Sequence, residues 1–122
     1  MRDFYGLKLG CGLGYHYPEG FEEAFAVGHI HREDNPVSET NLRKLALKRL
    51  DGIIVDKIQV RYMMKRVGLD PADFSTAYVF KPSPLCMRLH PNRKDLLPVL
   101  NAALKGMQAD GSIDRIVDSY LR

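Results

Sequence analysis

The spacing of apolar and basic residues predicts a helix followed by a strand in the middle of the chain. Leu42, Leu45 and Leu50 fall close to helical spacing, and basic residues occupy the positions around them: Arg43, Lys44, Lys48 and Arg49. This pattern predicts an amphipathic helix with one packed and one solvated face. The continuous apolar run Ile53–Val55 follows. It predicts a short parallel strand that is covered on both faces.

Asp56 comes directly after this predicted strand. Ligands of open α/β sheets collect at the carboxyl ends of parallel strands, so Asp56 is the first candidate binding residue. A carboxylate is equally suited to cap the helix that begins at the next residue. We expect that helix over Lys57–Val67, with Gly68 as its C-cap and Pro71 beyond. Both roles of Asp56 are open at this stage.

A glycine-rich turn is expected near the start of the chain. Leu7–Cys11 has the character of a strand, and glycines recur at positions 10, 12 and 14. Pro18 and the acidic pair Glu22 and Glu23 then indicate the first turn of a helix. Free backbone N–H groups and the positive end of that helix would favour an anion at the turn. The spacing is not GxGxxG and no P-loop is present, so no nucleotide is expected.

Two more features complete the predicted α/β unit. His29–Glu33 alternates weakly and predicts a short strand, and Ser38 is a suitable N-cap for the leucine-rich helix. The order is then strand, helix, strand, helix, strand, helix. This order predicts a three-layer α/β/α unit with a mainly parallel sheet and right-handed crossovers.

The pattern changes after Gly68. We expect strands over Ser75–Phe80 and Leu85–Leu89, joined by the extended segment Lys81–Pro84. Two helices should follow, the first capped by Asn92 and running to about Ala109, the second capped by Ser112. Leucines and isoleucines supply the apolar stripes of both helices: Leu96, Leu97, Leu100, Leu104, Ile113 and Ile116, with Val117 and Tyr120.

Composition excludes several classes of protein. The 122 residues, of which 45% are hydrophobic, are enough for one compact domain. The net charge is +3, and the 18 basic residues are interspersed with 15 acidic ones, which favours a solvated surface over a nucleic-acid interface. No apolar run is long enough to insert into a membrane, and the first residues lack the apolar core of a signal peptide.

The cysteines and histidines give no metal or cofactor signal. Cys11 and Cys86 each lie in a predicted buried strand and are expected to be small apolar core residues. A disulfide between them would require adjacent strands. The histidines show no zinc-ligand spacing with the cysteines, and no metal site or cofactor is predicted: His16, His29, His31 and His90.

Four segments carry motifs that occur together elsewhere: Phe4–Cys11, Lys48–Asp56, Leu85–Leu89 and Leu100–Ile116. Together they resemble a known family, the bacterial extracellular solute-binding proteins of family 3, which are type II periplasmic binding proteins. Phe4–Cys11 resembles the strand that begins the second lobe of these proteins, and Lys48–Asp56 resembles their G-R-x-D-A-x-x-x-D segment. Leu85–Leu89 is similar to the strand that returns to the first lobe, and Leu100–Ile116 is similar to the closing motif of the family. The resemblance covers nearly the whole chain.

The resemblance implies that the chain is one lobe of a two-lobed clamshell. Residues 1–80 would form the ligand-binding second lobe, and residues 81–122 would be the returning strand and two helices that normally pack on the first lobe. Without that lobe, the apolar side chains of the last two helices need another partner. We therefore expect a homodimer, formed by exchange of the C-terminal segment between chains. The alternative is that both helices fold back onto the sheet of the second lobe.

The resemblance also implies a site. Asp56 matches the acidic residue that accepts the α-ammonium group of an amino-acid ligand, and Gly14 and Tyr15 match the Gly-Thr pair that holds the α-carboxylate. Here the chain departs from the family, because Tyr15, His16 and Tyr17 replace small hydroxyl residues. Backbone N–H groups and His16 would then bind the anion. Packing is the alternative role of the two tyrosines.

By the same resemblance, the expected function is non-catalytic binding of a small polar solute, an amino acid or a related compound. Such a protein serves an ABC-type uptake system, works with a membrane permease, and resides in the periplasm or outside the cell. Two alternatives are a ligand-sensing domain of a larger receptor and an enzyme similar to the cyclohexadienyl dehydratases. The enzyme would need His16 as general acid.

Overall fold

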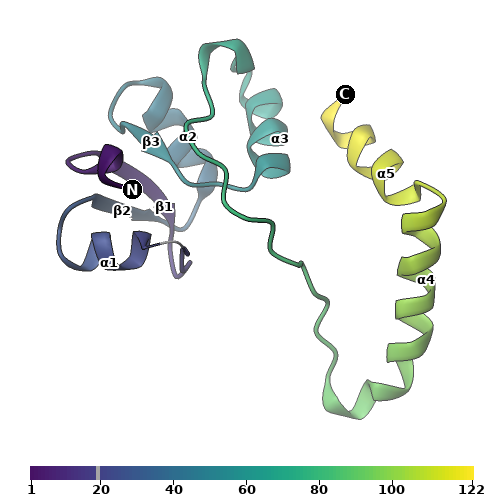
Figure 1. Cartoon of the computed structure of the whole chain (residues 1–122). Helices are drawn as coiled ribbons and strands as arrows, with labels where there is room; N and C mark the ends of the chain where they lie inside the picture. Colours follow the sequence, from purple (N-terminus) through teal and green to yellow (C-terminus); the bar gives the residue numbers. More distant parts are fainter. Residues whose placement is uncertain (19) are drawn as a thin grey trace. The chain divides into compact units, whose positions relative to one another are not determined.

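The computed structural model describes residues 1–18 and 20–122, and these form two compact units, Met1–Phe80 and Lys81–Arg122. The first unit contains a three-stranded parallel sheet with the order β2-β1-β3 (Figure 1). Its strands are β1 (Lys8–Gly12), β2 (His31–Asn35) and β3 (Gly52–Ile53), and its helices are α1 (Phe21–Ala26), α2 (Ser38–Ala46) and α3 (Lys57–Val67). Short 3-10 turns cover Arg2–Phe4 and Pro71–Asp73. The predicted α/β class with a parallel sheet is confirmed.

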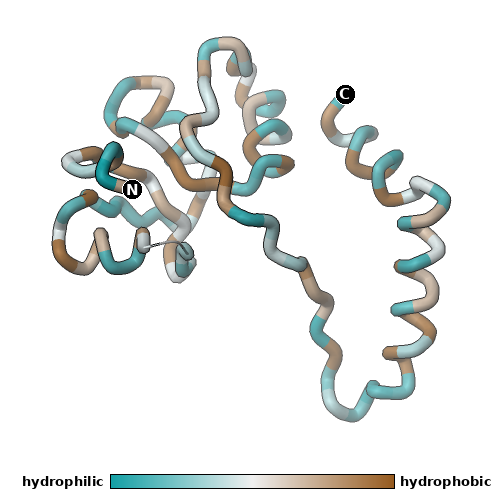
Figure 2. The backbone as a smooth tube through the Cα atoms, in the orientation of Figure 1, coloured by the Kyte–Doolittle hydropathy of each residue, from teal (hydrophilic) through white to brown (hydrophobic). Residues whose placement is uncertain are grey.

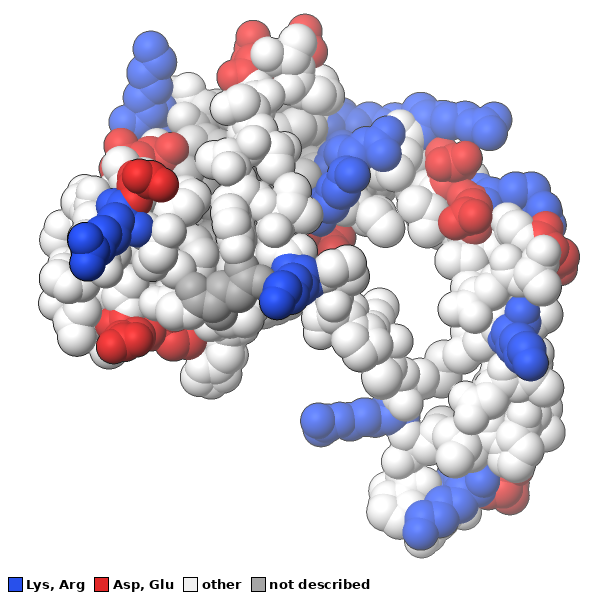
Figure 3. All heavy atoms as spheres, in the orientation of Figure 1, with Lys and Arg blue, Asp and Glu red and all other residues white. Residues whose placement is uncertain are grey.

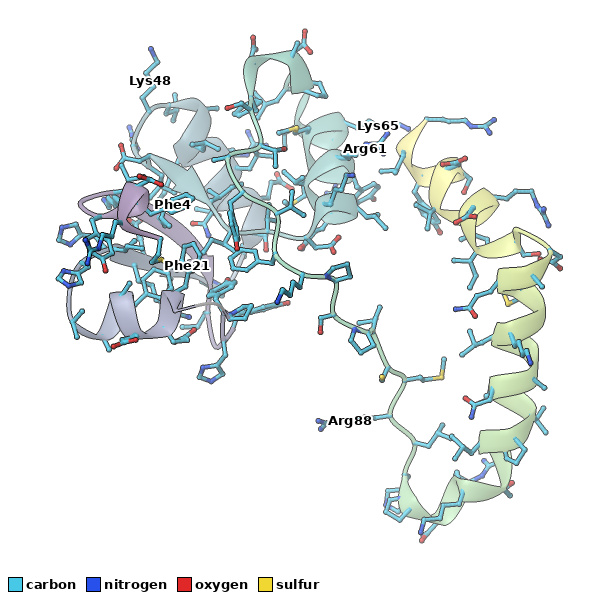
Figure 4. The ribbon with its side chains drawn as sticks, viewed as in Figure 1. Phe4, Phe21, Lys48, Arg61, Lys65 and Arg88 are labelled. Atoms are coloured by element: carbon cyan, nitrogen blue, oxygen red, sulfur yellow. The ribbon has the colours of Figure 1, made fainter. Side chains whose placement is uncertain are left out.

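The two faces of the sheet have separate cores. On the α1 side, Leu9 of β1 packs with Phe21, Ala24 and Ile30. Phe4 adds its ring to this cluster, 5.5 Å from the ring of Phe21 (Figure 4). The second core is built by α2 and α3, from which its three buried side chains come: Leu42, Met63 and Met64. Sheet and helices therefore stack as three layers, as the order of elements predicted.

Helix α2 approaches the sheet closely because β1 has a glycine beneath it. A Cβ atom at Gly10 would lie 2.7 Å from Leu50 Cδ1 and 2.9 Å from Asn41 Cγ. Asn41 is itself buried, and its Nδ2 donates to the carbonyl oxygen of Cys11 at 2.9 Å. The glycine at position 10 thus serves helix packing, and the asparagine ties α2 to the end of β1.

The ends of the helices agree in part with the predictions. Helix α3 has the predicted bounds, and Gly68 ends it with a φ of 70°. The N-cap predicted at Ser38 is wrong, because Ser38 is the first residue of α2 and Val37 occupies the cap position without a side-chain bond. The turn after α2 also contains Lys48, at a φ of 57°, whose side chain extends away from the ribbon (Figure 4).

The second unit, Lys81–Arg122, is helical. A 3-10 segment (Pro91–Leu96) leads into α4 (Leu97–Ala109), and α5 (Ser112–Leu121) follows a turn at Gly111, which has a φ of 72°. Hydrophobic residues recur along both helices (Figure 2), and none of their side chains is buried. Within the unit, α4 and α5 therefore leave apolar side chains in contact with solvent.

Two predicted strands are absent from the described residues. Neither Ser75–Phe80 nor Leu85–Leu89 has regular structure, and Leu85 is fully exposed at 101%. A strand needs a neighbour for its backbone N–H and C=O groups, and neither segment pairs with the sheet of residues 8–53. The prediction that Cys86 lies in a buried strand is therefore wrong, whereas Cys11 is buried as expected.

The N-caps predicted for the last two helices are also wrong. His90, not Asn92, caps the 3-10 segment, since its Nδ1 accepts a hydrogen bond from the Asn92 N–H at 3.2 Å. Gly111 occupies the cap position of α5, and Asp110 Oδ1 accepts from the Ser112 N–H at 2.8 Å. In both cases the acceptor side chain lies two residues before its donor.

The surface carries both signs of charge. On the face shown in Figure 3, Lys and Arg side chains are distributed over the surface with Asp and Glu side chains among them. This distribution is that of an ordinary solvated surface. None of the helices in the described part of the chain has the length and apolar character needed to cross a membrane.

Candidate ligand-binding groove

The carboxyl ends of the three parallel strands meet at one edge of the sheet, and a groove of about 400 Å³ lies there. Its volume falls within the range typical of small-molecule sites, about 300–1,000 Å³. The turn after β1, the β2–α2 connection and one face of α3 line it: Gly12, Leu13, Tyr15, Asn35, Pro36, Val37, Ser38, Glu39, Gln59, Tyr62, Met63 and Arg66. The groove is open to solvent, since Tyr15 is 64% exposed and Val37 is 54% exposed.

Helix α3 forms one wall. Its four lining residues, Gln59, Tyr62, Met63 and Arg66, recur at intervals of three and four and so share one helix face. At a rise of 1.5 Å per residue, this wall is about 10 Å long. Gln59 Nε2 donates to Ser38 Oγ at 3.4 Å, which connects α3 to the start of α2 on the opposite wall.

The turn after β1 is held by its own hydrogen bonds. The Leu13 N–H donates to the Asn35 carbonyl at 3.0 Å, and the Tyr15 N–H donates to the Gly12 carbonyl at 3.1 Å. The Gly12 N–H donates to the hydroxyl oxygen of Tyr17 at 2.9 Å. Burial raises the pKa of Tyr17, so this phenol stays neutral. The backbone of the turn is thus fixed to β1 and β2.

Arg32 of β2 also holds the turn after β1 in place. Its Nη2 donates to the Tyr15 carbonyl at 2.7 Å, and its Nε donates to Asp34 Oδ1 at 2.7 Å. Its Nη1 lies 3.3 Å from Glu22 Oε1 on α1. The guanidinium carbon also lies 5.5 Å from the centre of the Tyr17 ring, a cation–π distance. Arg32 is therefore a structural cation, fully engaged away from the groove.

The four site residues expected from the sequence have different positions. Tyr15 lines the groove, but Gly14, His16 and Asp56 do not. The side chain of His16 is 90% exposed, and its Nδ1 lies 3.9 Å from Glu22 Oε2. The Tyr15 N–H, expected to bind an anion, is already used within the turn. Gly14 has a φ of 79°, which a glycine adopts without strain.

Asp56 has the capping role that the sequence left open. Its Oδ1 accepts hydrogen bonds from the N–H groups of Ile58 and Gln59, both at 2.9 Å. Both bonds use the same oxygen, so capping does not require Oδ2. The carboxylate is exposed at the carboxyl edge of the sheet, one residue before α3.

Sequence reasoning missed most of the polar residues of the groove. Ser38, Glu39, Gln59 and Arg66 line it, and none was among the expected site residues. The spacing of Gln59, Tyr62 and Arg66 could have indicated a shared polar face of α3, opposite the face with Met64. What the sequence could not show is that this face borders the β2–α2 connection.

The two charged residues of the groove differ in their partners. Glu39 Oε1 accepts from Arg43 Nη2 at 3.0 Å, one turn along α2. The guanidinium carbon of Arg66 lies 5.8 Å from the centre of the Tyr62 ring. In the part of the chain that the structure describes, no carboxylate forms an ion pair with Arg66.

No metal-binding cluster of three or more His, Cys, Asp or Glu side chains exists among residues 1–18 and 20–122. Both cysteines are free thiols. Burial raises the pKa of Cys11 to about 11, so this thiol is protonated at neutral pH and is a poor nucleophile.

Comparison with known proteins gives two similar sequences. The chain is 26% identical over 118 residues to the L-cystine-binding protein TcyJ of Escherichia coli strain K12 and, equally, to the protein of the same name in E. coli O6:H1 strain CFT073. Each alignment covers 97% of this chain but only 43% of the relative, so the chain spans less than half the length of these proteins. No protein-family model matches the chain. No solved structure matches it either.

Proposed function

We propose that this chain is a ligand-binding lobe of a solute-binding protein, which holds a small, polar, amino-acid-like solute without converting it chemically. The observation that carries the proposal is the groove at the carboxyl edge of the parallel sheet, where ligands of α/β folds bind. The similarity to an L-cystine-binding protein, which extends over 97% of the chain, supports the same class of ligand.

The open shape of the groove favours a lobe over a complete receptor. Ligand sites usually bury most of their ligand, whereas a solute in this groove would keep one side in water beside the exposed Tyr15 and Val37. A second surface is needed to close it, as in the two-lobed class that the sequence resembles. In that setting the chain serves an ABC-type uptake system with a membrane permease, in the periplasm or outside the cell.

Within this proposal, Asp56 accepts the ammonium group of the ligand through Oδ2, while Oδ1 continues to cap α3. A charge-assisted hydrogen bond of this kind is about twice as strong as a neutral one. Gly14, Tyr15 and His16 follow β1 in the sequence, and Tyr15 lines the groove. The proposal assigns no catalytic residue: His16 is exposed, and the carboxylate of Glu22, 3.9 Å from its Nδ1, is also paired with Arg32.

Isothermal titration calorimetry with L-cystine, L-cysteine and the other amino acids tests the function. We expect saturable binding of at least one of them. Asp56→Asn keeps an efficient N-cap but removes the charge, so it should weaken binding of the ammonium-bearing ligand about tenfold while the thermal midpoint changes little. Absence of binding by the wild-type chain to all of these solutes would refute the proposal. Unchanged affinity in Asp56→Asn would limit Asp56 to its capping role.

We also propose that the chain forms a homodimer in which the apolar side chains of α4 and α5 are covered by the second copy. None of the side chains of these helices is buried, and Val99 and Ile116 are 64% and 50% exposed. Exposed apolar surface of this kind promotes association. Light scattering over a concentration series should show a dimer, and Ile116→Lys should weaken it. Asn101→Lys adds the same charge at an exposed polar position of α4 and should leave the dimer unchanged. A monomer at every concentration would contradict this.

A further inference from the structure

We infer that Arg66 is the residue that binds the carboxylate of the ligand, and that the groove selects elongated solutes whose anionic end reaches this side chain. The inference rests on the binding function proposed above. It assigns the anion to a side chain of α3 rather than to the glycine turn after β1.

Arg66 occupies one end of the groove wall that α3 forms. It is the last of the four α3 residues that line the groove, seven residues after Gln59. The two side chains therefore mark opposite ends of a wall about 10 Å long. The ring of Tyr62 lies between them on the same face, with the guanidinium carbon of Arg66 5.8 Å from its centre. A solute that spans this wall must place a polar group at each end.

The groove has one charged side chain of each sign among its described lining residues. Arg66 is the basic residue among the described lining residues, and Glu39 is the acidic one. Glu39 already pairs with Arg43, and Arg32 of β2 is bound by Asp34, Glu22 and the Tyr15 carbonyl. Arg66 has no such carboxylate among the described residues. Its donors are therefore available to an anion in the groove.

The side chain of Arg66 is suited to a carboxylate ligand. A guanidinium group presents donors in a planar fork that matches a carboxylate with two parallel hydrogen bonds. Other basic residues of α3 cannot take this role, because Lys57, Arg61 and Lys65 do not line the groove. Arg61 and Lys65 are exposed on α3, where Figure 4 labels them. The carboxylate of a ligand in the groove thus has one arginine to bind.

The experiment compares two probes by calorimetry with the full chain: L-cystine, and its dimethyl ester, which has the same length and ammonium groups but no carboxylate. Arg66→Gln should weaken L-cystine binding about tenfold or more and leave the affinity for the ester unchanged. Arg66→Lys keeps the positive charge but not the planar fork of donors. Its affinity for L-cystine should lie between those of the wild type and Arg66→Gln. Arg61→Gln removes the same charge from the same helix outside the groove and should change neither affinity more than about twofold.

Three results overturn the inference. The first is wild-type affinity for L-cystine in Arg66→Gln, and the second is an equal loss for L-cystine and the ester, which would show a steric or folding effect. The third is equal weakening of L-cystine in Arg61→Gln, which would show a general effect of charge. Each leaves the proposed function standing, because the wild-type chain still binds. If the wild-type chain binds neither the amino acids nor the ester, the proposed function fails and this inference fails with it.

Discussion

The amide nitrogen of Asn41 donates a hydrogen bond to the carbonyl oxygen of Cys11 at 2.9 Å, which joins helix α2 to the end of strand β1. Asn41 is only 4% exposed, and its Oδ1 has no partner among the described residues. The bond therefore gives the buried Cys11 carbonyl a side-chain donor next to the turn that borders the groove. It also fixes the distance between α2 and the sheet.

Removing this bond should destabilise the first unit. Asn41→Ala removes this buried hydrogen bond, which costs about 0.5–1.5 kcal/mol of unfolding free energy. Urea denaturation followed by circular dichroism measures it. Asn101→Ala, an exposed asparagine on α4, is the matched control and should have little effect. Equal stability of the two variants would show that the bond contributes nothing.

A methyl group at Gly10 should also destabilise the fold. Its carbon would lie 2.7 Å from Leu50 Cδ1 and 2.9 Å from Asn41 Cγ, so these packed side chains must shift, at a cost of about 1–3 kcal/mol. The control is Gly106→Ala in α4, where nothing lies within 4 Å of an added Cβ. There alanine should be neutral or stabilising by about 0.5–1 kcal/mol. Thermal unfolding of both variants would reveal the opposite signs, and a stabilised Gly10→Ala would contradict the packing described.

Protonation of Glu33 should contribute to the loss of folding stability in acid. Hydrogen bonds from Lys44 and from Lys8 lower the pKa of Glu33 from its ordinary value of 4.5 to about 2. A carboxylate with a lowered pKa in the folded state stabilises the protein fully above its unfolded pKa and progressively less as the pH falls to the folded pKa. The loss should therefore occur between about pH 4.5 and pH 2. Melting temperatures across this range should fall less steeply in Glu33→Gln, and identical slopes would exclude the effect.

The two thiols should differ in reactivity. Cys86 is exposed, whereas Cys11 is buried and its pKa is raised to about 11. Iodoacetamide at pH 8 should add one carbamidomethyl group to the native chain, at Cys86, and two after denaturation in urea. Peptide mass spectrometry identifies the modified residue. Rapid labelling of Cys11 in the native protein would show that β1 is more accessible than the structure indicates.

Capping by Asp56 can be separated from ligand binding. Asp56→Ala removes both hydrogen bonds to the start of α3 and should cost about 0.5–2 kcal/mol of stability. Asp56→Ser restores an acceptor without the charge and should recover most of that loss. Denaturation curves of the two variants give the difference. Equal destabilisation would show that charge, not the hydrogen bonds, stabilises the helix end.

The parts of the fold that depend on local pattern were predictable from the sequence. Helix α3 has the predicted bounds because its start and end signals, Asp56 and Gly68, lie next to the apolar run. The prediction of a strand at Leu85–Leu89 was wrong, because a strand needs a neighbouring strand to pair with, and the described residues provide none for this segment. Strand pairing is a long-range property, and pattern alone does not reveal whether the partner exists.

The candidate site was less predictable for the same reason. The edge of the sheet near Asp56 and Tyr15 follows from the order of strands and helices. The groove itself depends on which face of α3 borders the β2–α2 connection, and this is set by the packing of Leu42 against Met63 and Met64. Arg66 therefore could not be distinguished from Arg61 or Lys65 by sequence alone.

The hydrogen bonds within the turn from Gly12 to Tyr17 have a consequence for binding energetics. The Tyr17 hydroxyl, the Asn35 carbonyl and the Arg32 guanidinium already fix this wall of the groove without a solute. A ligand that docks there loses little free energy to the ordering of backbone, so this side acts as a rigid template. Conformational adaptation to different solutes must then come from the surface that closes over the groove. Affinity differences among solutes should accordingly appear mainly in dissociation rates.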